Sequence, residues 1–275
     1  MKRQFVSIYL LLFVAGVGLV NGQDGYQRAQ DVLLKARKVF SKNNENIEKV
    51  FIKVESDVKN SKARVKQGFI ARYSLRRKIL YSLSRKFELK KKYLYRSGGE
   101  NIRIQRLDGV VYSNVSSYKD AGDIKFRRSY SRAAGDPETA HRKAMGALRY
   151  EVFSAYFPIF LDFDKNMKFN YLGVAKSGDQ IADVIETKID GTYTIQLFFG
   201  QKSHRLLLIV SKFFRPRFKE NVEQRFFFSD YRLDHGFNFA HMIIVQENGE
   251  VMEERRIKKL IVNPAQKFGS FKLLQ

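Results

Sequence analysis

The chain has 275 residues, of which 44% are hydrophobic and 14% aromatic, a composition that suits one domain with a large core or an apolar cavity. It contains no cysteine, which excludes a disulfide framework, a thiol nucleophile and thiolate metal sites. The formal net charge of +23 favours anionic partners, namely lipid head groups, lipopolysaccharide or nucleic acid.

A secretory signal peptide is predicted for residues 1–22. Lys2 and Arg3 form a positive start, and an apolar run then extends to Val20. Val20 and Gly22 occupy the −3 and −1 positions of a cleavage site after Gly22. A membrane anchor is the alternative, but the run is shorter than the roughly 20 residues that a spanning helix needs. No cysteine follows as a lipid attachment site, so we expect a soluble, periplasmic or secreted mature protein.

A helix is predicted over residues 26–41, because its apolar residues recur at i, i+3 and i+4 spacing. From residue 47 the period changes to two, and strands punctuated by Gly and Asp-Gly follow. Within 87–96, apolar and charged residues alternate, which is typical of an antiparallel sheet with one solvated face.

A second helix is predicted over residues 137–157. Asp136 is its expected N-cap, Pro137 its first residue, and Pro158 the breaker beyond its end. More strands follow, with Asp190-Gly191 and Asn248-Gly249 as two-residue hairpin turns.

The predicted fold class is α+β. It is a strongly curved antiparallel sheet, an incomplete β-barrel of about ten or eleven strands, with an N-terminal helix and a mid-chain lid helix. No repeat or Pro-rich linker divides the chain, so residues 23–275 are expected to form a single domain.

The positive charge is concentrated in residues 61–106, where fifteen Lys and Arg face only two acids, Glu88 and Glu100. Such a field favours an anionic partner, although a merely solubilising surface explains it equally well. The side chains expected to contact anionic head groups are Arg76, Arg77, Lys90 and Lys92.

Residues 229–241 contain the densest cluster of potentially catalytic side chains, including Asp230, Arg232, His235 and His241. A strand places Asp230 and Arg232 on one face, and a turn separates the two histidines, so nothing brings the four together. No nucleophile-elbow, P-loop or zinc-protease motif occurs in the sequence, and residues 161–173 lack the Gly and Glu of a calcium loop. We therefore expect no catalytic residues, no metal site and no cofactor.

Residues 226–264 resemble the closing hairpins of the LolA-like periplasmic lipoprotein carriers, and hairpins at 182–209 and 106–114 match earlier parts of that pattern. The similarity covers roughly residues 80–264 and departs from the family at Ala240, where Pro is usual, and at His235. The matching positions are Ser229, Asp230, Tyr231, Arg232, Gly236, His241, Asn248, Gly249, Ile257, Lys258, Lys259, Val262, Asn263 and Pro264.

This resemblance implies a bent half-barrel that shields acyl chains in a hydrophobic cavity beneath helical lids. The expected function is a non-catalytic periplasmic carrier of lipid acyl chains or lipoproteins, with cations at the cavity mouth engaging head groups. The alternative is a basic-surface module for lipid head groups, lipopolysaccharide or another polyanion, and an enzyme ranks last. We expect a monomer that visits the inner or outer membrane surface and binds no nucleic acid. The expected cavity lining is Phe69, Tyr81, Phe87, Leu148, Val152, Tyr156, Phe198 and Phe226.

Overall fold

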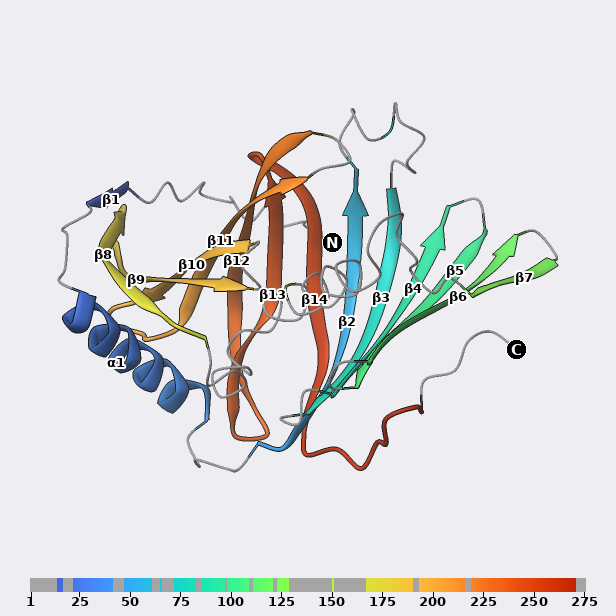
Figure 1. Ribbon diagram of the computed structural model, residues 1–275, viewed down its shortest axis with the longest axis horizontal. Helices are drawn as coiled ribbons and strands as arrows, with labels where there is room; N and C mark the ends of the chain where they lie inside the picture. Colours follow the sequence, from blue (N-terminus) through green and yellow to red (C-terminus); the bar gives the residue numbers. More distant parts are fainter. Residues whose placement is uncertain are drawn as a thin grey trace, which may run out of the picture.

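The described residues of this computed structural model form one antiparallel sheet of fourteen strands and one long helix (Figure 1). The described residues are 14–16, 22–41, 47–60, 65, 72–82, 86–96, 98–108, 111–120, 123–128, 150, 167–189, 193–215 and 219–270.

The helix α1 spans Gly22–Phe40. The strands are β1 Val14–Gly16, β2 Lys49–Lys59, β3 Arg72–Ser82, β4 Lys86–Tyr95, β5 Glu100–Asp108, β6 Val111–Asp120, β7 Asp123–Arg128, β8 Asn170–Ser177, β9 Gln180–Ile189, β10 Tyr193–Gly200, β11 Leu206–Arg215, β12 Glu220–Asp234, β13 Phe237–Glu247 and β14 Glu250–Val262.

Two meanders, β2–β7 and β8–β14, make up nearly the whole sheet, whose order is β1-β8-β9-β10-β11-β12-β13-β14-β2-β3-β4-β5-β6-β7. The last strand, β14, joins them by pairing with β2 from Glu253 opposite Val58 to Val262 opposite Val50. Figure 1 shows the sheet twisting strongly between its β8 and β7 ends, as a long antiparallel sheet must. The curved antiparallel sheet predicted from the sequence is thus confirmed.

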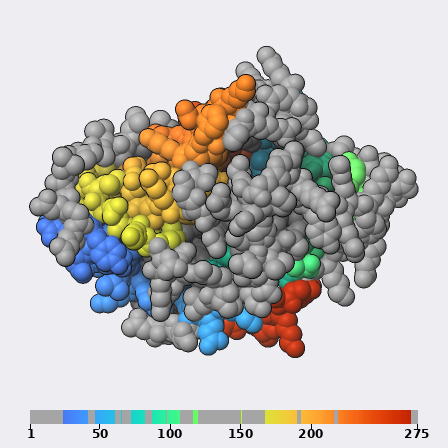
Figure 2. Space-filling view, in the orientation of Figure 1, coloured from blue at the N-terminus to red at the C-terminus, as the bar shows by residue number. Residues whose placement is uncertain are grey.

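The helix α1 defines the inner face of the sheet. Its buried stripe is Ala29, Leu33, Ala36 and Phe40, at the helical spacing read from the sequence. The helix packs against β8 and β13, and Figure 2 shows it directly beside the yellow strands β8 and β9. At its end the Phe40 ring lies 5.5 Å from that of Phe237.

The predicted hairpin at Asn248-Gly249 is confirmed, with φ angles of 49° and 86° that a type I′ turn requires. The predicted number of about ten or eleven strands is too low, since the described residues form fourteen, and the hairpin expected at 106–114 is the β5–β6 pair. The short β1 and β7 were not predicted at all. The mid-chain lid helix lies outside the described residues except for Tyr150, which is helical. Asp190-Gly191 also falls outside them.

The strand β1 lies inside the predicted signal peptide, whose cleavage remains a prediction. Within the part of the chain that the structure describes, no helix is both long and apolar enough to cross a membrane.

Asn263 ties the β14–β2 junction together. Its Oδ1 accepts hydrogen bonds from the backbone N–H groups of Glu48 and Lys49, at 2.9 and 3.0 Å, and its own N–H donates to the Lys49 carbonyl at 2.7 Å. Asn263→Ala should lower the free energy of unfolding by about 1–3 kcal/mol, since two backbone donors lose their acceptor. Urea titration measures this. Asn263→Asp retains an acceptor oxygen and should lose clearly less; an equal loss in both variants would refute the assignment.

Candidate functional site

The inner face of the sheet is a continuous apolar surface that crosses the β14–β2 junction. Alternate residues of each strand point to it, because side chains in a strand have a period of two. It joins both meanders and the α1 stripe in one core cluster. Its most buried strand residues are Val50, Ile52, Val54, Leu89, Ile185, Ile195, Leu197, Ile209 and Ile243.

Tyr150, the single described residue of the range predicted for the second helix, lies on this surface. Its ring stacks on Tyr193 with centroids 4.2 Å apart and lies 5.8 Å from Phe213 and 6.4 Å from Phe226. Burial raises the pKa of the Tyr150 phenol far above its usual value, so the hydroxyl stays protonated. That hydroxyl donates a 2.9 Å hydrogen bond to Oε1 of Gln224. One residue thus contacts the inner face both through its ring and through its hydroxyl.

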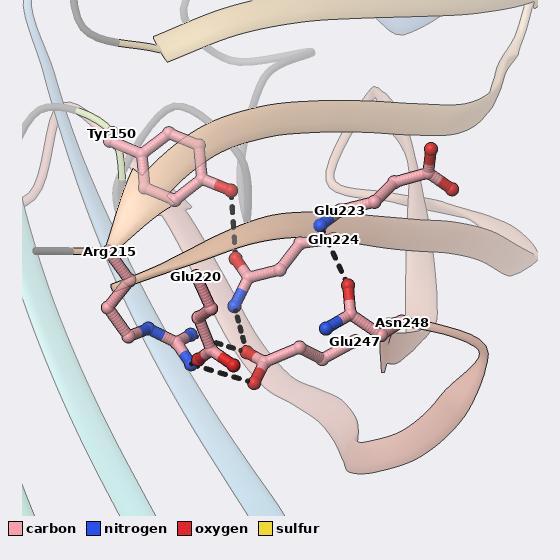
Figure 3. A network of polar contacts seen from close by, with 7 residues as sticks. All are labelled: Tyr150, Arg215, Glu220, Glu223, Gln224, Glu247 and Asn248. Carbon is pink, nitrogen blue, oxygen red and sulfur yellow. Dashed lines mark hydrogen bonds and ion pairs between the residues drawn. The ribbon is translucent and has the colours of Figure 1, made fainter. Parts of the chain in front are cut away.

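A chain of polar contacts continues from Gln224 toward the ends of β11 and β12 (Figure 3). Gln224 Nε2 donates to Glu247 at 2.9 Å, and Arg215 donates to both carboxylate oxygens of Glu247, at 3.0 and 2.7 Å. Arg215 also donates to Glu220 at 2.7 Å. Burial lowers the pKa of Arg215, but the bonds to Glu247 and Glu220 outweigh it and raise the pKa above its usual value. The network fixes the polar side chains of Gln224, Glu247 and Arg215 at the border of the apolar inner face.

A second polar cluster is buried in the middle of the inner face. Glu253 accepts a 2.6 Å hydrogen bond from Arg77 and a 2.9 Å hydrogen bond from Arg255, and Arg77 also donates to Ser56 at 2.8 Å. The Arg255 guanidinium lies 5.5 Å from the Phe226 ring centroid. Burial alone would raise the pKa of Glu253, but Arg255 and Arg77 lower it far below its usual range. Glu253 is therefore ionised and shared by two arginines.

Partly exposed tyrosines extend the inner face along β3 and β4. The ring of Tyr73 lies 5.7 Å from Tyr93 and 6.1 Å from Tyr95. Burial, then the neighbouring Tyr93 and Glu253, raise the pKa of Tyr73 to about 12. This tyrosine wall has apolar rings and polar tips, a combination that suits the boundary between an acyl chain and water.

The opposite, outer face of β2–β4 carries a basic hollow of about 280 Å³. Its lining residues are Lys53, Arg76, Arg77, Lys78, Lys90 and Lys92. Burial, followed by the charges of Lys78 and Lys92, lowers the pKa of Lys90. All four residues that were expected to contact anionic head groups line the hollow, but the Arg77 guanidinium is buried in the ion pair with Glu253 and only the other three present their charge there.

Comparison with solved structures identifies the fold. An outer membrane lipoprotein-sorting protein domain from Vibrio parahaemolyticus matches over 90% of this chain and 96% of its own, with a TM-score of 0.50 and 14% identity. This chain has a LolA-like fold. A LolA superfamily protein from Nitrosomonas europaea matches over 86% of this chain and 94% of its own, with a TM-score of 0.47 and 12% identity. No family model and no curated protein matches the sequence.

The LolA-like sheet places three of the predicted cavity residues on its inner face. Tyr81 and Phe87 are cross-strand partners with ring centroids 4.0 Å apart, and Phe226 is almost fully buried beneath Tyr150. Phe69, Leu148, Val152 and Tyr156 lie outside the residues whose side chains the structure describes. Whether any of the eight contacts a ligand remains a prediction.

Phe198 does not lie with Phe226, contrary to expectation. It belongs to a separate outer-face cluster with Val184 and Leu208. The reason is register: Phe198 pairs with Leu208, which pairs with Phe227, whereas Phe226 pairs with Ile209. Leu197 and Phe199 take the inner positions of β10 instead.

The cations expected at the cavity mouth do not share a face with the apolar surface, and their contact with head groups remains a prediction. Arg76, Lys90 and Lys92 are on the outer face, because they occupy the register positions that alternate with the inner residues Ile79 and Leu89. Arg77 occupies an inner register position opposite Val54, and its side chain bonds Glu253 on that face. The LolA-like sheet itself therefore separates these cations from the apolar surface.

The cluster at residues 229–241 is spread over the fold as expected. Asp230 and Arg232 form an exposed ion pair, with contacts of 2.9 and 2.6 Å. His235 is on the tip of the β12–β13 turn, and His241 contacts the Ile257 carbonyl at 3.2 Å through Nδ1. Among the described residues, no group of three His, Cys, Asp or Glu side chains is arranged to hold a metal ion.

Tyr231 is the residue of this cluster with a clear structural task. Its buried hydroxyl donates to the Leu206 carbonyl at 2.5 Å, and the Arg205 guanidinium lies 5.0 Å from its ring. Burial raises its pKa well above the usual value. The side chain thus fixes β12 to the start of β11.

Sequence reasoning missed Tyr150 and the buried Arg77–Glu253–Arg255 cluster. Tyr150 does not share the i, i+4 spacing of the expected lining residues Leu148, Val152 and Tyr156, so its position in the sequence gave little signal. Arg77 and Glu253 are 176 residues apart, and only the β14–β2–β3 pairing brings them together. The sequence signal for their different environments was that Arg76 and Arg77 are successive residues of a strand, whose side chains point to opposite faces of the sheet.

Proposed function

We propose that this protein binds lipid acyl chains, free or attached to lipoproteins, on the inner face of its LolA-like sheet and performs no covalent chemistry. The observation that carries the proposal is the continuous apolar inner face, which spans both meanders and is bordered by the tyrosine wall. Burying an acyl chain contributes about 0.8 kcal/mol per CH₂, so binding needs no reactive group.

Two further observations support this function. The Vibrio domain that shares the fold is described as an outer membrane lipoprotein-sorting protein domain, and we propose by analogy that this chain also binds a cargo that carries acyl chains. The predicted signal peptide supports a periplasmic or secreted location in which residues 23–275 are the mature protein. Mass spectrometry of the exported protein should find Gln23 as its first residue, and retention of residues 1–22 would contradict that location.

The expected binding behaviour is a dependence on chain length. In titrations with fluorescent acyl probes of increasing length, each added CH₂ should tighten binding about fourfold until the chain exceeds the site, since 0.8 kcal/mol corresponds to that factor. Equal affinities for short and long probes would exclude apolar burial as the basis of binding.

A pair of adjacent substitutions locates the site. Tyr93 and Leu94 are neighbours on β4, both partly buried, and face the inner and outer sides of the sheet respectively. Tyr93→Ser should weaken binding of the longest probe about tenfold, because it removes part of the tyrosine wall. Leu94→Ser should leave it unchanged, and the reverse result would place the acyl chain on the outer face.

A further inference from the structure

Four lysines form a single row across the outer face of the sheet. Lys259 of β14 is paired with Lys53 of β2, Lys53 with Lys78 of β3, and Lys78 with Lys90 of β4. Like charges placed directly opposite each other destabilise a sheet. An anionic partner bound over the row would relieve this repulsion.

Neighbouring acidic side chains neutralise the positive charge of this row only in part. Glu55 lies 3.7 Å from Lys53 and 3.9 Å from Arg76, and Glu100 contacts Lys92 at 2.6 Å. Lys78 forms no ion pair with any acid among the described residues. The middle of the row therefore keeps excess positive charge at the hollow of about 280 Å³.

The outer face beside the hollow is already covered. Beyond Lys90 the next strand presents Ile104, which packs with Phe51, Leu80 and Ile102, and Phe268 from the C-terminal segment lies against this group. The backbone N–H of Gly269 donates to buried Glu88 at 2.9 Å and anchors that segment. The C-terminal residues thus shield the apolar neighbours, whereas the Lys53 and Arg76 side chains of the hollow are 41% and 58% exposed among the described residues.

We propose that the basic hollow binds the phosphate groups of an anionic lipid bilayer and docks the protein on a membrane surface. Lysine ammonium groups bind phosphate as point charges, and several of them converge here on a recess of suitable size. An anionic leaflet attracts clustered Lys and Arg strongly, and this attraction acts over a Debye length. The partner is a surface and not the bound lipid itself, because the sheet separates the hollow from the inner face.

Co-sedimentation with vesicles tests the proposal. The full chain should bind vesicles that contain phosphatidylglycerol and not vesicles of phosphatidylcholine alone. Raising ionic strength from about 0.01 to 1 M shortens the Debye length from about 30 to 3 Å and should release the protein. Binding to both vesicle types with equal affinity would overturn the proposal.

A matched pair of triple variants separates the hollow from net charge. Lys53→Gln, Lys78→Gln and Lys90→Gln together should weaken vesicle binding about hundredfold, at about fivefold per charge, and should not harm folding because they remove repulsion. The control replaces the exposed Lys176, Lys188 and Lys202 with Gln, which removes the same charge elsewhere and should retain most binding. If both triple variants lost vesicle binding equally, the net charge of the protein and not the hollow would determine binding.

Two further measurements distinguish the ligand source and the site. If the protein bound inorganic phosphate or heparin but not vesicles, the proposal that the hollow docks on a membrane would be overturned. Acyl-probe binding should be the same in the hollow triple and the wild type, so failure of vesicle docking and failure of the proposed acyl-chain function are read out separately.

Discussion

Glu253→Gln is expected to lower the free energy of unfolding by about 3–5 kcal/mol, the usual loss when one partner of a buried ion pair is removed. The carboxylate of Glu253 accepts hydrogen bonds from Arg77 and Arg255, and all three side chains are at most 8% exposed. Among the described residues, Nε and Nη1 of Arg255 have no hydrogen-bond acceptor. The substitution leaves two buried guanidinium groups beside a neutral amide in place of the carboxylate that they share.

The adjacent Glu254→Gln is the matched control. Glu254 also pairs with an arginine, Arg256, but both are exposed on the outer side of β14. Exposed pairs contribute roughly 0–1 kcal/mol, so this variant should stay close to the wild type in urea unfolding. A similar loss in both variants would show that the buried cluster is no more important than a surface pair.

The same cluster predicts a specific pH dependence. The pKa of Glu253 is depressed in the folded state, so its contribution is complete above the unfolded-state value of about 4.3 and is lost as pH falls toward the folded-state value. Glu253→Gln has no such group to protonate. The stability difference between wild type and variant should therefore be constant from about pH 5 to 7 and shrink below about pH 4. A difference that grows on acidification would contradict the assigned sign.

Elements with a local signal were predicted correctly. The α1 stripe follows from the spacing of Ala29, Leu33, Ala36 and Phe40, and the Asn248-Gly249 turn from the positive φ that these residues tolerate. The LolA-like fold was predicted from the motif pattern of residues 226–264. In each case the determining residues are neighbours in sequence.

Features that depend on strand register were not predictable in the same way. Phe198 was assigned to the wrong face of the sheet. Which alternate residues of β10 point to the inner face is decided by the pairing of β10 with β9 and β11. The full row of four lysines required the pairing of β14 with β2, which places Lys259 opposite Lys53 across 206 residues of chain. Local alternation shows that two faces differ, but only long-range pairing shows which face is buried.

Pairing also explains why basic residues 61–106 yield two different environments. Alternate positions of one strand send Arg77 into the ion cluster and Arg76 to the hollow. The number of Lys and Arg residues in this part of the sequence is therefore larger than the number of positive charges on the outer face, because Arg77 is buried in an ion pair. On the inner face the buried charges of Arg77, Glu253 and Arg255 are paired with one another, which is the condition under which buried charge is tolerated.

Tyr150→Ala is expected to destabilise the protein and strengthen acyl-chain binding together. Loss of the ring that packs on Tyr193, Phe213 and Phe226 should cost about 3–5 kcal/mol, as for other buried aromatic side chains. The vacated volume lies on the apolar inner face, where an acyl chain would otherwise have to displace the ring. We therefore expect about tenfold tighter binding of a hexadecanoyl probe, equivalent to about 1.4 kcal/mol.

Tyr150→Phe is the control that separates the ring from its hydroxyl. It keeps the aromatic contacts and removes only the bond to Gln224, which still donates to Glu247. Its stability should fall by about 1 kcal/mol, and its probe affinity should remain that of the wild type because the ring still fills the space. Thermal unfolding and probe titration on the three proteins measure both quantities. Unchanged probe affinity in Tyr150→Ala would show that the acyl chain binds elsewhere, since filling the space left by the ring is what links the two effects.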